Sequence, residues 1–229
     1  PTLMLFGTEE QKRAHLPLIA RGDRVWCQGY SEPGAGSDLA SLQMRAVEDG
    51  DDFVVNGSKM WTSGAHRADW MFLLARTDPA APRHKGITFF LADMKSPGIT
   101  VRPLVNMAGF HSFNQVFFDN VRVPKTNIVG EKEKGWYVAV TLLDFERSGM
   151  EYIGVAFRTL EEIVRAARET TRNGQPLAKD PLVRHKLAEM AVECQVGRAL
   201  AYRVAWLQTK GGVPAAEASA AKVFGSELN

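Results

Sequence analysis

The chain has 229 residues, enough for one large domain or two smaller ones with a sizeable buried core. Apolar residues make up 45% of it and charged residues 24%, which excludes a disordered or fibrous protein. Its 28 basic and 26 acidic residues leave a net charge of +2 without blocks of like charge, so we expect no nucleic-acid partner and no binding to an anionic membrane.

The sequence shows no sign of export or of a membrane segment. No run approaches the ~20 apolar residues of a membrane span, and the first residues lack a signal-peptide pattern. Cys27 and Cys194 have no cysteine neighbour in a CxxC pair, so we expect free thiols rather than a zinc site or a disulfide. These features predict a cytoplasmic protein without a membrane span.

The first 24 residues predict one helix. Thr8 is placed to cap it, Gln11 three residues later can complete a capping box, and the helix is expected to end near Gly22. Because its apolar side chains have no earlier element to pack against, we expect the chain to be a piece of a longer protein.

Residues 25–125 predict a β-domain. Short apolar or alternating runs at 52–55, 70–76 and 86–92 are separated by clusters of Gly, Pro, Asp and Asn. Because no helical pattern lies between these runs, they indicate an antiparallel barrel or sandwich rather than a parallel βαβ fold.

Residues 126–229 predict a helical bundle. From Gly135 to Ala156 apolar and small residues recur every three or four positions, and a second such pattern runs from Pro181 to Thr209. A third pattern begins at Ala215. The predicted fold class is therefore α+β: an antiparallel β-barrel or sandwich followed by an antiparallel helical bundle, with a short N-terminal helical remnant.

The segment Tyr30–Asp38 predicts a tight polar turn that follows a strand. It lacks the third glycine of a dinucleotide fingerprint, and no second parallel strand follows at βαβ distance, so we reject a Rossmann site. Its backbone N–H groups and the hydroxyls of Ser31 and Ser37 can instead face a phosphate or the edge of a flavin. The alternative is a plain Pro-Gly turn between two strands.

An aromatic residue with nearby hydroxyls follows the strand signal that opens at Val54. The indole of Trp61 can cover one face of a flat ring, and the hydroxyl of Ser63, two residues along the strand, points to the same side and can reach a heteroatom of that ring. For this segment alone, the alternative is a core tryptophan with a surface serine.

Four segments follow one another along the chain: Glu32–Asp38, Asn56–Trp61, Phe117–Pro124 and Gly130–Trp136. Their order and spacing resemble the acyl-CoA dehydrogenase family of flavin enzymes. The resemblance covers nearly the whole chain. It implies the end of an N-terminal helical domain (1–24), a β-domain that binds flavin and acyl-CoA (25–125) and part of a C-terminal helical bundle (126–229).

The resemblance also implies a function. It predicts an FAD-dependent oxidoreductase of fatty acid and lipid metabolism that desaturates an acyl-CoA thioester by α-proton abstraction and β-hydride transfer. The implied partners are the acyl-CoA substrate, an acceptor such as electron-transfer flavoprotein, and further subunits of a homo- or hetero-oligomer.

The same resemblance implies which residues bind the cofactor. Gln28, Tyr30 and Ser31 would lie against the flavin, and Trp61 and Ser63 would flank its reactive nitrogen. Hydrogen-bond donors at the pyrimidine edge matter because negative charge collects there when hydride arrives.

Three further residues, Ser37, Asp144 and Arg147, are implied in binding coenzyme A, with Ser37 at its phosphate-bearing part. Removal of an α-proton needs a carboxylate in a dry pocket, where burial raises its basicity. Glu146 shares a mostly apolar helical face with Met150, and it resembles the base of the isovaleryl-CoA dehydrogenase branch. The alternatives are a base from a later loop that this chain does not contain, or a cavity-lining role for Glu146.

Residues 170–176 depart from the family pattern. Asn173 stands where a phenylalanine is common, and the arginine that clamps a neighbouring subunit's flavin pyrophosphate is displaced or lost. A non-catalytic subunit of a mixed complex is therefore one alternative, and a flavin monooxygenase or nitroalkane-oxidase-like enzyme on the same fold is another. The five histidines lack metal-ligand spacing, so we expect no metal.

Overall fold

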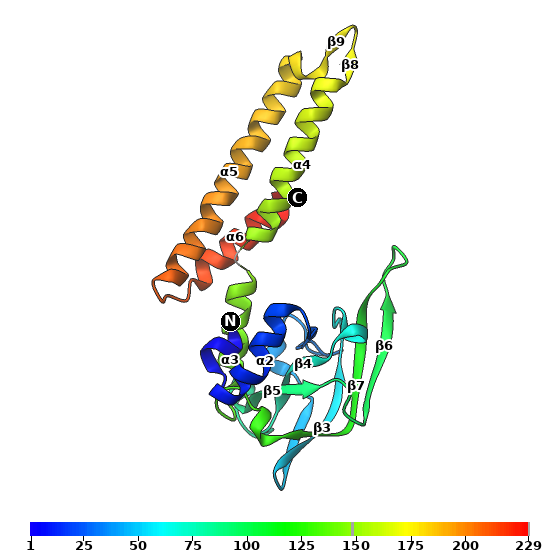
Figure 1. The fold of residues 1–229 in the computed structure, drawn as a ribbon, viewed down its shortest axis with the longest axis vertical. Helices are drawn as coiled ribbons and strands as arrows, with labels where there is room; N and C mark the ends of the chain where they lie inside the picture. The colour runs from blue at the N-terminus through cyan, green and yellow to red at the C-terminus, as the bar shows by residue number, and fades with distance from the viewer. Residues whose placement is uncertain (148, 229) are drawn as a thin grey trace. The chain divides into compact units, whose positions relative to one another are not determined.

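The computed structural model of the chain describes residues 1–147 and 149–228. These residues form two compact units, Pro1–Val140 and Thr141–Asn229, and the division falls within one helix. Figure 1 shows the ribbon of both units, with labels on many of the helices and strands. No helix in the described part of the chain is long and apolar enough to cross a membrane. The predicted α+β class, a β-domain followed by helices, is confirmed.

Two helices, α1 (Thr2–Phe6) and α2 (Glu9–Arg21), open the first unit. The predicted capping box is confirmed: Gln11 N donates to Thr8 Oγ1 at 3.2 Å, and Thr8 N donates to Gln11 Oε1 at 3.1 Å. α2 ends at Gly22, whose φ of +74° is the left-handed conformation that closes many helices.

Seven strands form one sheet in the order β1-β4-β2-β3-β7-β6, with β5 paired to β4. The strands are β1 (Trp26–Gly29), β2 (Arg45–Asp49), β3 (Asp52–Lys59), β4 (Trp70–Arg76), β5 (Ile87–Asp93), β6 (Ile99–Val105) and β7 (His111–Pro124). Most neighbours are antiparallel, as the sequence indicated. Two pairings are parallel and were not predicted: β1 with β4, where Trp26 lies opposite Trp70, and β2 with β4, where Arg45 lies opposite Arg76.

The core of the first unit is made mainly by alternate side chains of the strands. Its fully buried members include Val55 of β3, Met71 and Leu73 of β4, and Phe90 of β5. The register of β3 on β7 shifts after Val55, at Gly57. A Cβ at Gly57, where φ is +142°, would lie 3.1 Å from the Cα of Met44, so this bulge requires glycine.

The remaining helices are α3 (Gly135–Glu146), α4 (Met150–Glu169), α5 (Pro181–Thr209) and α6 (Ala215–Leu228). The sequence predicted one helix from Gly135 to Ala156, whereas the structure has two. Gly149 precedes α4 with a φ of +82°, which no continuous right-handed helix contains. A two-stranded hairpin, β8 (Thr171–Arg172) and β9 (Gln175–Pro176), connects α4 to α5.

Candidate functional site

The structure brings the two predicted flavin-binding segments together. Met60 N donates to Ser31 O at 2.8 Å, and Lys59 Nζ donates to Tyr30 O at 3.0 Å. Two hydrogen bonds therefore join the segment after β1 to the segment that leads to Trp61. This is the arrangement that a shared cofactor site requires.

A buried ion pair fixes this junction. Lys59 Nζ lies 2.8 Å from Glu32 Oε1, and the side chain of Lys59 is 0% exposed. The carboxylate of Glu32 also accepts from Gln43 N at 2.7 Å and from Met44 N at 3.0 Å. Burial lowers the pKa of Lys59 to about 8, although the charge of Glu32 acts in the opposite direction. The sequence motif included both residues but did not reveal their pairing.

The turn that leads to Ser37 is closed by two backbone hydrogen bonds, and the space around its glycines is open. Glu32 N donates to Ala35 O at 2.9 Å, and Ala35 N donates to Glu32 O at 3.1 Å. A Cβ placed on Gly34 or Gly36 would meet no described atom within 4 Å. Ser37 itself is exposed, so its hydroxyl is available to a ligand.

Arg76 holds the chain that follows this turn. Its buried guanidinium donates to Leu42 O at 3.0 Å, Ala40 O at 2.8 Å and Arg83 O at 2.8 Å. The arginine side chain thereby links the residues after the turn to the loop that contains Arg83, through hydrogen bonds to both. Sequence reasoning missed this arginine, because it ends an apolar strand and carries no motif.

The cofactor-binding residues predicted on and after β1 differ in exposure. Gln28 is half-buried, whereas Tyr30 is 5% exposed and lies edge-on to the rings of Phe72 and Phe89, at 6.0 and 6.4 Å. The ring of Tyr30 is therefore part of the domain's packing. A cofactor in this region would meet the backbone at Tyr30 and the half-buried side chains of Gln28 and Ser31.

Trp61 and Ser63 lie in the loop after β3, which ends at Lys59. We expected the two side chains to point to the same side because they alternate along a strand. This prediction is wrong, because neither residue lies in a strand. Trp61 has a φ of +62°, a conformation that costs a residue other than glycine about 1–3 kcal/mol. Its indole is 59% exposed and edge-on to Phe113 at 6.1 Å, and Ser63 is exposed.

These features fit a flat cofactor with hydrogen-bonding edges. Trp61 is exposed and has a strained backbone conformation, and Ser63, two residues later, is also exposed. The buried Thr62 Oγ1 has no hydrogen-bond partner among the described residues. Strain and unpaired polar atoms of this kind concentrate at ligand sites. The open turn at Gly34 supplies room for a phosphate-bearing group.

The three predicted residues of the second unit lie at the end of α3. Glu146 is the last residue of the helix and is exposed, so the helical face it was expected to share with Met150 is interrupted. Arg147 is also exposed. Asp144 is 6% exposed, and its Oδ2 has no hydrogen-bond partner among the described residues. Desolvation raises the pKa of Asp144, while the charge of Arg147 acts in the opposite direction.

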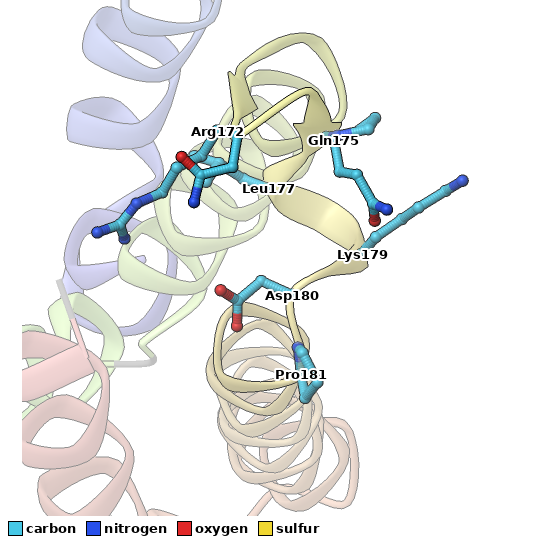
Figure 2. Close-up of a pocket in the computed structure, with 8 residues that line it drawn as sticks. Arg172, Gln175, Leu177, Lys179, Asp180 and Pro181 are labelled. Atoms are coloured by element: carbon cyan, nitrogen blue, oxygen red, sulfur yellow. The ribbon is translucent and has the colours of Figure 1, made fainter.

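The loop that departs from the family pattern is a tight hairpin. Asn173 and Gly174 have φ values of +53° and +77°, the two positive angles that an Asn-Gly turn between antiparallel strands requires. A pocket of about 450 Å³ lies beside the hairpin. Figure 2 shows Arg172 and Lys179 extending to different sides of it, so the two cations do not converge on one anion.

Comparisons with known proteins match most of the chain to one family. The family described as "Acyl-CoA dehydrogenase, middle domain" matches residues 27–121, and "Acyl-CoA dehydrogenase, C-terminal domain" matches residues 133–229. The "Acyl-CoA dehydrogenase IpdE1" of Mycobacterium tuberculosis is 46% identical over 190 residues, which are 82% of this chain and 48% of that protein. The chain thus spans about half the length of this curated relative.

Two solved structures share the fold along the whole chain. The "Tcur3481-Tcur3483 steroid ACAD" has a TM-score of 0.88 at 40% identity, and the match covers 100% of this chain and 58% of that one. The "ChsE4-ChsE5 complex from Mycobacterium tuberculosis" has a TM-score of 0.87 at 41% identity and covers 100% and 59%.

Proposed function

The chain belongs to the acyl-CoA dehydrogenase family, and we propose that the full-length protein desaturates an acyl-CoA thioester between its α and β carbons. The observation that carries this proposal is the hydrogen bond that Met60 N donates to Ser31 O. It joins the two segments that resemble the family's flavin site. The reaction removes an α-proton and a β-hydride from the substrate, so it needs a base and a hydride acceptor.

We propose FAD as the cofactor. When bound, FAD supplies the hydride acceptor. The side chain of Gln28, the backbone at Tyr30 and the hydroxyl of Ser31 would bind one edge of its ring system, with Trp61 and Ser63 covering a face. Two observations support these roles: the hydrogen bond between the two segments, and the exposed indole of Trp61 with its strained backbone.

In the first unit, Ser37 of the open turn would donate its hydroxyl to a phosphate-bearing part of coenzyme A. In the second unit, Arg147 is proposed as a cation that binds the negatively charged substrate. Asp144 is buried, so its expected contribution is a hydrogen bond rather than a surface charge.

We propose Glu146 as the base. Its carboxylate is exposed, so the dehydration that makes a carboxylate more basic would come from the bound acyl chain. Asp144 is a second candidate, because burial already raises its pKa and one of its oxygens has no hydrogen-bond partner among the described residues.

The matched variants Glu146→Gln and Asp144→Asn test the assignment in the full-length protein. If Glu146 is the base, Glu146→Gln lowers kcat by about 10²–10⁴-fold and leaves FAD binding unchanged, while Asp144→Asn retains activity within about tenfold. Anaerobic bleaching of the bound flavin by a panel of acyl-CoA thioesters, steroid-bearing ones included, gives the rate. The reverse pattern would transfer the role to Asp144, and no bleaching by any thioester would contradict the function.

We propose a mixed oligomer as the assembly and electron-transfer flavoprotein or a similar protein as the acceptor. The Asn173-Gly174 turn replaces the aromatic residue that the family commonly uses in this loop. Two of the similar structures are named as pairs of different chains. We place the enzyme in the cytoplasm, where its two buried free thiols would stay reduced. A homo-oligomer of the full-length protein that binds one flavin per chain without a second kind of subunit would contradict the mixed assembly.

A further inference from the structure

A fully buried amide on β7 holds the segment that carries Trp61. Asn114 is 0% exposed, and its backbone and side chain bind both backbone polar groups of one residue. Thr62 N donates to Asn114 O at 2.9 Å, and Asn114 Nδ2 donates to Thr62 O at 3.0 Å. Gly64 N donates to Ser112 O at 3.1 Å, so the attachment continues beyond Ser63.

This attachment acts where the backbone is strained. Trp61 is the residue directly before Thr62, and its φ of +62° persists only if its surroundings enforce it. The indole itself is 59% exposed and contacts Phe113 edge-on, which is too little packing to hold that conformation. The hydrogen bonds at Thr62 are the stronger constraint on the backbone.

Two histidines complete the hydrogen bonds of the same amide. His111 Nε2 lies 2.8 Å from Asn114 Oδ1, and His66 Nδ1 lies 3.2 Å from Asn114 Nδ2. Because Nδ2 must donate to the carbonyl of Thr62, Oδ1 is the acceptor that faces His111 and Nδ2 is the donor that faces His66. His111 therefore carries a proton on Nε2, and His66 presents an unprotonated Nδ1.

The two imidazoles also contact each other. Their ring centroids are 4.1 Å apart and their planes are inclined by 30°, so the rings are stacked. With one hydrogen bond to each ring and one to Thr62 O, both polar atoms of the Asn114 side chain are satisfied. A complete network of this kind specifies one orientation of a buried amide.

We propose that Asn114, held in orientation by His66 and His111, is a positioning residue that fixes Trp61 and Ser63 for the flavin. The proposal rests on the proposed function, in which these two side chains flank the cofactor. Asn114 touches neither substrate nor cofactor in this role. It acts through the backbone of Thr62.

Asn114→Asp tests the role, because a carboxylate has nearly the same shape but cannot donate to the carbonyl of Thr62. Asn127→Asp is the matched control: Asn127 Nδ2 also donates to a strand carbonyl, that of Leu91 at 2.9 Å, away from this loop. We expect Asn114→Asp to weaken FAD binding by about tenfold or more, and Asn127→Asp to leave it within about twofold. Equal effects of the two variants would overturn the proposal.

Conservative substitution of His111 separates positioning from general packing. In His111→Gln the amide Nε2 can still donate to Asn114 Oδ1, whereas His111→Leu cannot donate at all. FAD affinity should therefore be retained in the first variant and reduced in the second. An unchanged affinity in His111→Leu would overturn the part assigned to the histidines.

Amide hydrogen exchange of the protein without FAD distinguishes this inference from the proposed function. Asn114→Asp should speed exchange at Thr62 and Gly64 by about tenfold, and Asn127→Asp should not. Exchange at Thr62 that is unchanged by Asn114→Asp overturns the positioning role. If the wild-type protein bound no FAD, the proposed function would fail, and the exchange rates alone would decide whether Asn114 fixes this segment.

Discussion

The ammonium group of Lys59 is buried next to the carboxylate of Glu32, at the junction between β3 and the turn after β1. Its hydrogen bond to Tyr30 O fixes the backbone where the flavin would lie. Removal of this charge from water is costly, and the carboxylate and the carbonyl offset only part of the cost. The pKa of Lys59 falls from 10.5 to about 8 for this reason.

The lowered pKa of Lys59 predicts how stability depends on pH. Between about pH 8 and pH 10.5 the unfolded chain holds the Lys59 proton and the folded chain does not, so the free energy of unfolding should rise with pH. Urea unfolding of the wild type and of Lys59→Met across this range measures the effect. The rise should be absent from Lys59→Met, and identical pH profiles for the two proteins would contradict it.

At the scale of elements, α3 begins directly against the backbone of β5. A Cβ on Gly135 would lie 2.3 Å from Phe89 N and 2.4 Å from the carbonyl carbon of Thr88, and these are backbone atoms of a strand that is hydrogen-bonded to β4. We expect Gly135→Ala to lower the free energy of unfolding by about 1–3 kcal/mol in urea unfolding.

A second helical glycine provides the control for Gly135→Ala. Gly154 lies on an exposed part of α4, where an added Cβ would meet no described atom within 4 Å. Gly154→Ala should therefore raise the free energy of unfolding by about 0.5–1 kcal/mol through helix propensity. Equal effects of the two substitutions would mean that the start of α3 can shift on β5.

Sequence patterns within a few residues predicted many of the helices and strands. They did not predict the contacts between residues that are distant in sequence. The capping box of Thr8 and Gln11 and the bounds of α5 follow from patterns within a few residues. In contrast, Asn114 and His66 are 48 residues apart, and no local pattern predicts that a buried amide is a positioning residue. The parallel pairings of β4 were missed for the same reason.

At the scale of the whole molecule, the two units differ in how much apolar surface they bury. The first has a large core with buried residues from six strands, including Met71 and Phe90, whereas a core cluster of the second consists of Val204, Ala218 and Ala221. Because burial of apolar area is the main source of stability, we expect the helical unit to unfold first.

Two optical signals separate the units during urea unfolding. Four of the five tryptophans, Trp26, Trp61, Trp70 and Trp136, belong to the first unit, and only Trp206 belongs to the second. Circular dichroism at the helix band should therefore change at lower urea than tryptophan fluorescence, most clearly in Trp206→Phe. Coincident transitions in that variant would show one cooperative molecule.

The parallel pairing of β1 with β4 has a consequence for synthesis on the ribosome. Val25 and Asp69, whose hydrogen bond adjoins this pairing, are 44 residues apart, so β1 stays without its partner until β4 has left the exit tunnel. Nascent chains arrested before Trp70 should be cut by protease near Gln28, and chains arrested well after Arg76 should resist. The proposed cofactor site is thus completed late in translation, although its first strand is made early.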